Sequence, residues 1–64
     1  MKKFRVVYET GWRGWGYDGT TTERIIEAKD FEAAFYKAKS KDWGYETCAR
    51  IVLLEELIEE MAVD

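Results

Sequence analysis

The sequence predicts a single small α+β domain, with one helix packed on a three-stranded antiparallel sheet in the strand order 2-1-3. Three segments alternate between apolar and polar residues and are rich in β-branched and aromatic side chains, which is typical of strands. A single segment between the second and third strands has apolar residues at helical spacing. The chain has 64 residues, so we expect one domain over residues 1–64 that buries only about 60% of its unfolded surface.

The first two strands form a predicted hairpin. Residues 2–10 alternate, with side chains such as Phe4 and Tyr8 on one side and mostly polar ones on the other. Residues 11–19 hold four glycines and an aspartate, a composition typical of a loop. Residues 20–28 are again rich in β-branched side chains. We therefore predict two strands joined by a long, glycine-rich and aromatic loop.

A helix is predicted over residues 31–41, with Asp30 as its N-cap. A competing start at Thr20, with Glu23 at capping-box spacing, would give a longer helix. Consecutive threonines and isoleucines have low helix propensity, which favours the start at Asp30. The apolar residues at helical spacing, which we expect to face the sheet, are Phe31, Ala34, Phe35 and Ala38.

Residues 45–54 are predicted to form the third strand, and residues 55–62 an acidic tail. Two readings of the tail stay open, a short amphipathic helix or an extension of the strand. Like-charged glutamates four residues apart, and acidic groups at a helix C-terminus, oppose the helix. The residues whose spacing favours it are Leu54, Leu57, Ile58 and Met61.

The strand order follows from the helical connection. A helical crossover makes the third strand parallel to the second, so its simplest place is beside the first strand. The face of the sheet without the helix would then carry Val7 and Ile25, with either Val52 and Leu54 or Ile51 and Leu53. Such an apolar face needs a cover. The tail helix, a second copy in a homodimer, or a partner protein would supply it.

The composition excludes several kinds of function. The chain has no His and a single Cys, Cys48, so the usual metal-ligand sets and intramolecular disulfides cannot form within it. We expect Cys48 to be a buried, inert thiol, and we expect no cofactor, no metal and no catalytic residues, so not an enzyme. The longest apolar run covers only residues 51–54, too short to span a membrane. We expect a cytoplasmic protein in a reducing compartment.

Residues 14–19 match the phosphate-binding pattern GxGxxG. In dinucleotide-binding folds this pattern opens a helix whose N-terminus holds the pyrophosphate. Here a strand is predicted to follow instead. The glycines therefore indicate a hairpin turn rather than a phosphate site.

The same loop contains the residues that we predict to bind a partner, namely Trp12, Arg13, Trp15 and Tyr17. Trp, Tyr and Arg are enriched at binding hot spots, because they bury large areas with little loss of rotamer entropy. The alternative is that Trp12 or Trp15 folds back to supplement a thin core. Farther along, Trp43 and Tyr45 flank Gly44, and we expect them to seal the end of the helix.

Charge suggests two weaker surfaces. The chain has 13 acidic and 10 basic residues, a balance that does not favour a duplex-DNA binder. Basic residues on the hairpin, with the aromatic loop, leave a single-stranded nucleic-acid binder as an alternative function; these are Lys2, Lys3, Arg5 and Arg24. A secondary acidic surface, either solvated or docked on a basic partner, would consist of Glu55, Glu56, Glu59 and Glu60.

Residues 4–9, 25–35 and 49–57 together resemble the small ββαβ proteins common in bacteriophage genomes. The resemblance is one of pattern and size. It implies a protein that binds and redirects a host protein, which would place this chain in the cytoplasm of a bacterial host. Our leading hypothesis is accordingly a small intracellular protein-interaction module, an accessory protein or inhibitor that binds through its aromatic hairpin loop.

Overall fold

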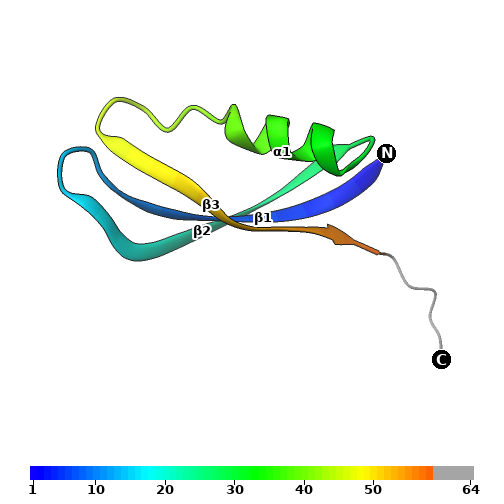
Figure 1. The fold of residues 1–64 in the computed structure, drawn as a ribbon, viewed down its shortest axis with the longest axis horizontal. Coiled ribbons are helices and arrows are strands. Elements are labelled where there is room, and N and C mark those ends of the chain that lie inside the picture. The colour runs from blue at the N-terminus through cyan, green and yellow to red at the C-terminus, as the bar shows by residue number, and fades with distance from the viewer. Residues whose placement is uncertain (59–64) are drawn as a thin grey trace.

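A computed structural model describes residues 1–58 of the chain and has the predicted architecture. The elements are β1 (Lys2–Trp12), β2 (Gly16–Ala28), α1 (Phe31–Lys39) and β3 (Thr47–Leu57). The sheet order is β2-β1-β3, and β1 is antiparallel to both neighbours. In Figure 1, α1 lies on one face of the sheet, over the half nearest the N-terminus, and the β1–β2 turn extends to the opposite end.

The core lies between α1 and the side chains of β1 that alternate toward it. Phe4 and Val6 are completely buried, and the hydroxyl of Tyr8 donates a hydrogen bond to the Ala38 carbonyl at 2.8 Å. Small residues let the helix approach the sheet closely, because an alanine side chain adds little thickness. The buried core residues are Phe4, Val6, Tyr8, Ile26, Ala28, Ala34 and Ala38.

The predicted helix face is buried at its two alanines and only partly covered at its two aromatic residues. Phe31 is 54% exposed and Phe35 is 39% exposed. The ring of Phe31 meets that of Phe4 edge-on, with 6.0 Å between centroids. With Ala34 and Ala38 this close to the sheet, larger rings on the same face find room only at the margins of the contact.

The N-cap at Asp30 is confirmed. One of its carboxylate oxygens accepts a hydrogen bond from the Ala33 N–H at 2.8 Å. Glu32 lies in the first turn of α1 and Lys37 and Lys39 in the last, which complements the helix dipole. The helix ends at Lys39, two residues before the predicted end, where the Ser40 hydroxyl donates to the Lys37 carbonyl at 2.9 Å.

Replacing Asp30 with alanine is expected to lower the free energy of unfolding by about 1 kcal/mol, because the Ala33 N–H loses its acceptor. Urea unfolding followed by circular dichroism measures this loss. Lys29→Ala is the matched control, since Lys29 precedes the cap and is exposed. Equal stability of the Asp30 variant and the wild type would contradict the capping role.

The third strand differs from its prediction at both ends. It begins at Thr47 and continues to Leu57. Of the two readings of the tail, the strand extension is therefore correct for residues 55–57 and the helix is wrong there. The reason is tertiary, because β1 continues alongside as a pairing partner and places Arg5 opposite Glu55. The remainder of the predicted tail, including Glu59 and Glu60, lies outside the described residues.

A β-bulge at Val52 decides which side chains of β3 face the helix. The pairing with β1 shifts there, so that Ile51 is opposite Tyr8 while Leu53 is opposite Val7. Because directly opposite residues share a face, Ile51 and Leu54 lie on the helix side and Leu53 on the open side. Neither alternation predicted from the sequence is correct, since an extra residue reverses the alternation beyond it.

The face of the sheet opposite α1 carries both apolar residues and ion pairs. Its apolar centre includes Val7 and Leu53, and Ile25 is 51% exposed. The Arg5 guanidinium spans the sheet, with 2.7 Å to Glu23 and 2.8 Å to Glu55. The hydrogen bonds that Arg5 donates to these two carboxylates raise its pKa, so its charge is fixed.

Among residues 1–58, no segment lies over this open face, and the homodimer expected from it stays a prediction. Sedimentation velocity at micromolar concentration should then show a species of twice the 7.5 kDa chain mass. A lone 7.5 kDa species would contradict the dimer. Within the described part of the chain, no helix is long and apolar enough to cross a membrane.

Candidate functional site

The predicted loop of residues 11–19 is mostly strand, which leaves a short turn at its end. Trp12 pairs with Gly16, and the Trp15 N–H donates to the Trp12 carbonyl at 2.9 Å. Gly14 and Gly16 have φ values of 91° and 97°, a left-handed conformation that glycine adopts without strain. The turn therefore places Arg13 and Trp15 at the far end of the hairpin.

A register shift below the turn sets the position of the next aromatic residue along β1. Thr10 is opposite Thr20 but Gly11 is opposite Tyr17, so β2 has two extra residues at this point. One of these, Asp18, accepts a hydrogen bond from the Thr20 N–H at 3.0 Å. The shift brings Tyr17 opposite Gly11. Because two extra residues keep the alternation of side chains, Tyr17 stays on the open face of the sheet.

Hydrogen bonds from Thr20, first from its backbone N–H and then from its hydroxyl, hold the pKa of Asp18 below its ordinary value of 3.8. A carboxyl whose pKa is lower in the folded chain than in the unfolded chain stabilises the fold above the unfolded pKa. That contribution is lost as the pH falls through the folded pKa. We expect the Asp18 carboxyl to titrate below 3.8 by carbon-detected NMR. We also expect Asp18→Asn to remove this part of the acid sensitivity, whereas a midpoint at or above 3.8 would contradict the hydrogen-bonded turn.

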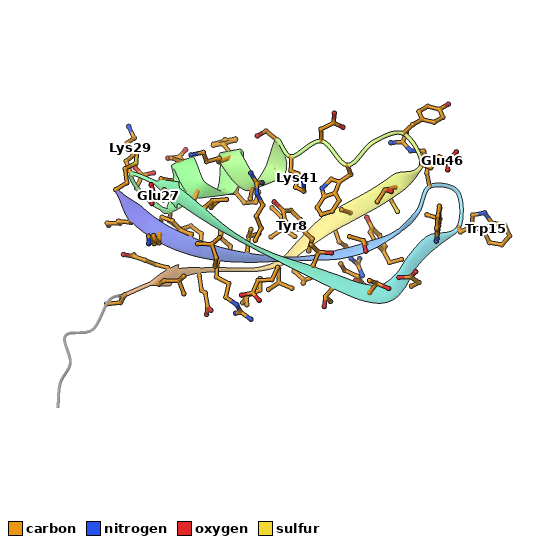
Figure 2. The ribbon with its side chains drawn as sticks, turned by 180° about the vertical axis from the view of Figure 1, so that it is seen from behind. Tyr8, Trp15, Glu27, Lys29, Lys41 and Glu46 are labelled. Atoms are coloured by element: carbon orange, nitrogen blue, oxygen red, sulfur yellow. The ribbon has the colours of Figure 1, made fainter. Side chains whose placement is uncertain are left out.

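The connection between α1 and β3 lies beside the hairpin turn, at the same end of the molecule. The Arg13 N–H donates to the Glu46 carbonyl at 2.8 Å. The Arg13 guanidinium lies over the Tyr45 ring, 5.7 Å from its centroid. Figure 2 shows Trp15 at the outermost end, with Glu46 nearby.

The four aromatic side chains at this end are exposed. Trp15 is 89% exposed, Tyr45 83%, Trp12 57% and Tyr17 41%. The alternative in which Trp12 or Trp15 supplements the core is therefore wrong. We call Trp12, Arg13, Trp15, Tyr17 and Tyr45 the aromatic tip.

A different tryptophan supplements the core. Trp43 is half-buried and meets the Tyr8 ring edge-on, with 4.9 Å between centroids. The expected role at the end of the helix is thus correct for Trp43 but wrong for Tyr45, whose ring lies over Arg13 instead. Gly44 between them has a φ of 90°, and its N–H donates to Asp42 at 3.0 Å. Because of this turn, the Trp43 ring packs on Tyr8 in the core while the Tyr45 ring packs on Arg13 at the hairpin turn.

Two hollows lie beside the tryptophans of the aromatic tip. One, of about 480 Å³, is completed by Tyr17 and Asp18. The other, of about 300 Å³, is completed by Tyr45 and Glu46. Trp12 and Trp15 line both. The tip thus offers apolar walls with a carboxylate at the edge of each hollow.

Tyr17 is held in place from the third strand. The Arg50 guanidinium lies 4.3 Å from the Tyr17 ring centroid and donates two hydrogen bonds to Glu9, at 3.0 and 2.7 Å. The bonds to Glu9 raise the pKa of Arg50, so this cation is permanent. A guanidinium that is anchored on one side and stacked on the other restricts the Tyr17 ring.

The basic residues expected near the aromatic loop do not gather there. Lys2 and Lys3 pair with the far ends of β2 and β3. Arg5 is held between two glutamates, and Arg24 donates to the Tyr8 hydroxyl at 3.3 Å. The hairpin therefore has no continuous basic stripe leading to the tip in the described part of the chain.

The predicted acidic surface is divided between the two faces of the sheet. Glu55 is opposite Arg5 on the open face, whereas Glu56 is opposite Phe4 on the helix side. Glu59 and Glu60 lie outside the described residues. Cys48 is half-buried in β3 rather than fully buried.

Sequence reasoning found four members of the aromatic tip and missed the fifth, Tyr45, together with Glu46, which lines the hollow beside it. A signal was present, because β3 runs antiparallel beside β1 and must begin where β1 ends. The residues just before β3 therefore lie beside the hairpin turn. A third strand predicted to start at residue 45 concealed this, since it placed Tyr45 inside the sheet.

Among the described residues, no group of three carboxylate or thiol side chains could hold a metal ion. The chemistry of the aromatic tip is that of a contact surface, with large rings, one guanidinium and flanking carboxylates. A comparison of the chain with protein family models, curated proteins and solved structures found no match.

Proposed function

We propose that this chain is a protein-interaction module that binds the surface of a partner protein through its aromatic tip. The observation that carries the proposal is the exposure of four large aromatic side chains at one end, from two loops joined by the hydrogen bond from Arg13 to Glu46. Exposed tryptophans at a loop end add nothing to the core. They fit the anchor residues that dominate binding energy in protein interfaces.

The order of the tip supports binding over simple exposure. The Trp12–Trp15 turn bond, the Arg13–Glu46 bond and the stack of Arg50 on Tyr17 each fix part of it. A surface that is ordered before it meets its partner loses less conformational entropy on binding. A partner with apolar side chains and a few hydrogen-bond donors would suit the two hollows.

The resemblance to small bacteriophage proteins extends the proposal to the kind of partner. It implies that the partner is a host protein in the cytoplasm of a bacterium, which this chain inhibits or redirects. Binding of single-stranded nucleic acid by the same tip is the alternative, and it needs backbone-neutralising cations beside the rings. The basic residues considered for this role lie elsewhere or in ion pairs, which favours a protein partner.

A comparison of capture from bacterial lysate tests the proposal. The wild type, the Trp12→Ala, Trp15→Ala double variant and a Tyr36→Ala control are immobilised at equal density. Tyr36 is 59% exposed on α1 and lies outside the tip, so its replacement controls for the loss of a surface ring. We expect the double variant to keep its melting temperature and to bind the captured protein about 100-fold more weakly or worse, as for two hot-spot residues.

The control should bind as the wild type does. A folded double variant that still binds every captured protein would contradict the proposal. The salt dependence separates the two classes of partner, because affinity for nucleic acid falls steeply as salt rises. A complex made by aromatic anchors should change little over the same range.

A further inference from the structure

A third hollow lies on the helix side of the sheet, away from the two beside the aromatic tip. Its volume is about 350 Å³, which is within the range of ligand-binding clefts. We call it the helix groove. Its aromatic and aliphatic lining consists of Tyr8, Phe35, Ala38, Trp43, Ala49 and Ile51, and two basic residues, Lys39 and Arg50, complete it.

The groove exists because α1 is anchored to one side of the sheet. Lys37 donates to the Glu27 carbonyl of β2 at 2.7 Å, and Ala38 accepts from Tyr8 of β1. Within residues 1–58, no hydrogen bond ties α1 to β3. The bulge at Val52 turns Ile51 toward this side, where the helix only partly covers it.

Two lysines lie over the aromatic walls of the groove. The Lys39 ammonium is 5.5 Å from the Phe35 ring centroid, and the Lys41 ammonium is 4.7 Å from the Trp43 ring centroid. Neither is within 4.0 Å of a carboxylate among the described residues. Figure 2 shows Tyr8 between α1 and the sheet and Lys41 near the end of the helix.

We infer that the helix groove is a second docking site, which takes an acidic peptide segment of a partner protein. One apolar side chain of the segment fills the hollow, and its flanking carboxylates pair with Lys39 and Lys41. Charge complementarity carries this choice, because Lys39 lines the groove and Lys41 lies over the ring of Trp43 in its wall. Neither lysine has a carboxylate partner in residues 1–58. A cation held over a ring keeps its outer side open to an anion, so both contacts can be made together.

Two blocked synthetic peptides test the inference. The probe has the pair Phe-Leu between two glutamates on each side, and the control has lysines in place of the glutamates. We expect NMR titration with the probe to shift the signals of Ala38, Ala49 and Ile51. We expect the lysine peptide to bind at least about tenfold more weakly.

Variants locate the site and its charge. Lys39→Gln with Lys41→Gln should weaken the probe about 3- to 10-fold, whereas Lys29→Gln, at the other end of α1, should change nothing. Ala49→Leu should fill the hollow and abolish the shifts while the circular dichroism spectrum stays that of the wild type. Trp12→Ala with Trp15→Ala should bind the probe unchanged, which separates this site from the aromatic tip.

Equal binding of both peptides would overturn the inference. So would shifts confined to the aromatic tip, full binding by the folded Ala49→Leu variant, or the absence of binding to the wild type. None of these results bears on the proposed role of the aromatic tip, which the lysate capture tests separately.

Discussion

Replacement of Phe4 with alanine is expected to leave most of the chain unfolded at room temperature. Phe4 is completely buried on the central strand, with Ile26 opposite it on β2 and the Phe31 ring against its edge. Truncating a buried phenylalanine to alanine costs about 3–5 kcal/mol. A single core in a chain of this size supplies about the same total stability, so the loss is comparable with everything that holds the fold.

Far-UV circular dichroism and urea unfolding measure this effect. Phe35→Ala is the matched control, since it removes the same atoms from a side chain that is 39% exposed. We expect the control to cost about 1 kcal/mol, as for partial loss of apolar burial. If both variants were equally stable, the core would not be centred on β1.

The strand order and the helix could be predicted because local and tertiary preferences agree there. Phe4, Val6 and Tyr8 alternate with polar residues, and this alternation matches the single buried face of β1. Asp30 satisfies a backbone donor at the start of α1, which is a local interaction visible in the sequence. Strand, strand, helix and strand then leave few arrangements that connect without crossing.

The bulge and the end of β3 could not be predicted, because neither is decided locally. One extra residue at Val52 reverses the side-chain alternation, and no residue type in this apolar run marks its position. Residues after Leu54 have helical spacing in the sequence. Pairing with β1 and the ion pair between Arg5 and Glu55 make them strand instead, so tertiary contacts override propensity.

The part of the aromatic tip that lies in the hairpin could be predicted from the residue composition of residues 11–19. Two tryptophans in a glycine-rich loop are unusual, and the hairpin places them together without any long-range contact. Tyr45 joins them only because β3 starts beside the end of β1. A contact between Arg13 and Tyr45 depends on the register of two strands, which residue patterns do not encode.

Replacement of Gly11 with alanine is expected to dismantle the aromatic tip. Gly11 is buried at the register shift between β1 and β2. A Cβ atom there would overlap the Gly16 carbonyl oxygen and lie 2.7 Å from the Tyr17 Cα. Both neighbours are backbone, so the two strands must separate at the turn. We expect a loss of about 1–3 kcal/mol in unfolding free energy, as for overpacking.

The larger effect should be on partner binding. Separation of the strands moves Tyr17 from the Arg50 stack and removes the pairing of Trp12 with Gly16, which places both tryptophans. We expect Gly11→Ala to lose the captured partner as completely as the Trp12→Ala, Trp15→Ala double variant does. NMR should show changed signals at Trp12, Tyr17 and Arg50, with the signals of α1 unchanged.

Gly14→Ala is the control that identifies the cause. Gly14 also lies in this hairpin, but apart from its two chain neighbours no described residue has an atom within 4 Å of where its Cβ would be. Its φ of 91° makes alanine strained there, at a cost of about 1–2 kcal/mol. If both variants lost stability to a similar extent but only Gly11→Ala lost the partner, the close approach of the strands would be what orders the tip. If Gly11→Ala and Gly14→Ala bound the partner equally well, the aromatic side chains would not need the close approach of β1 and β2 for binding.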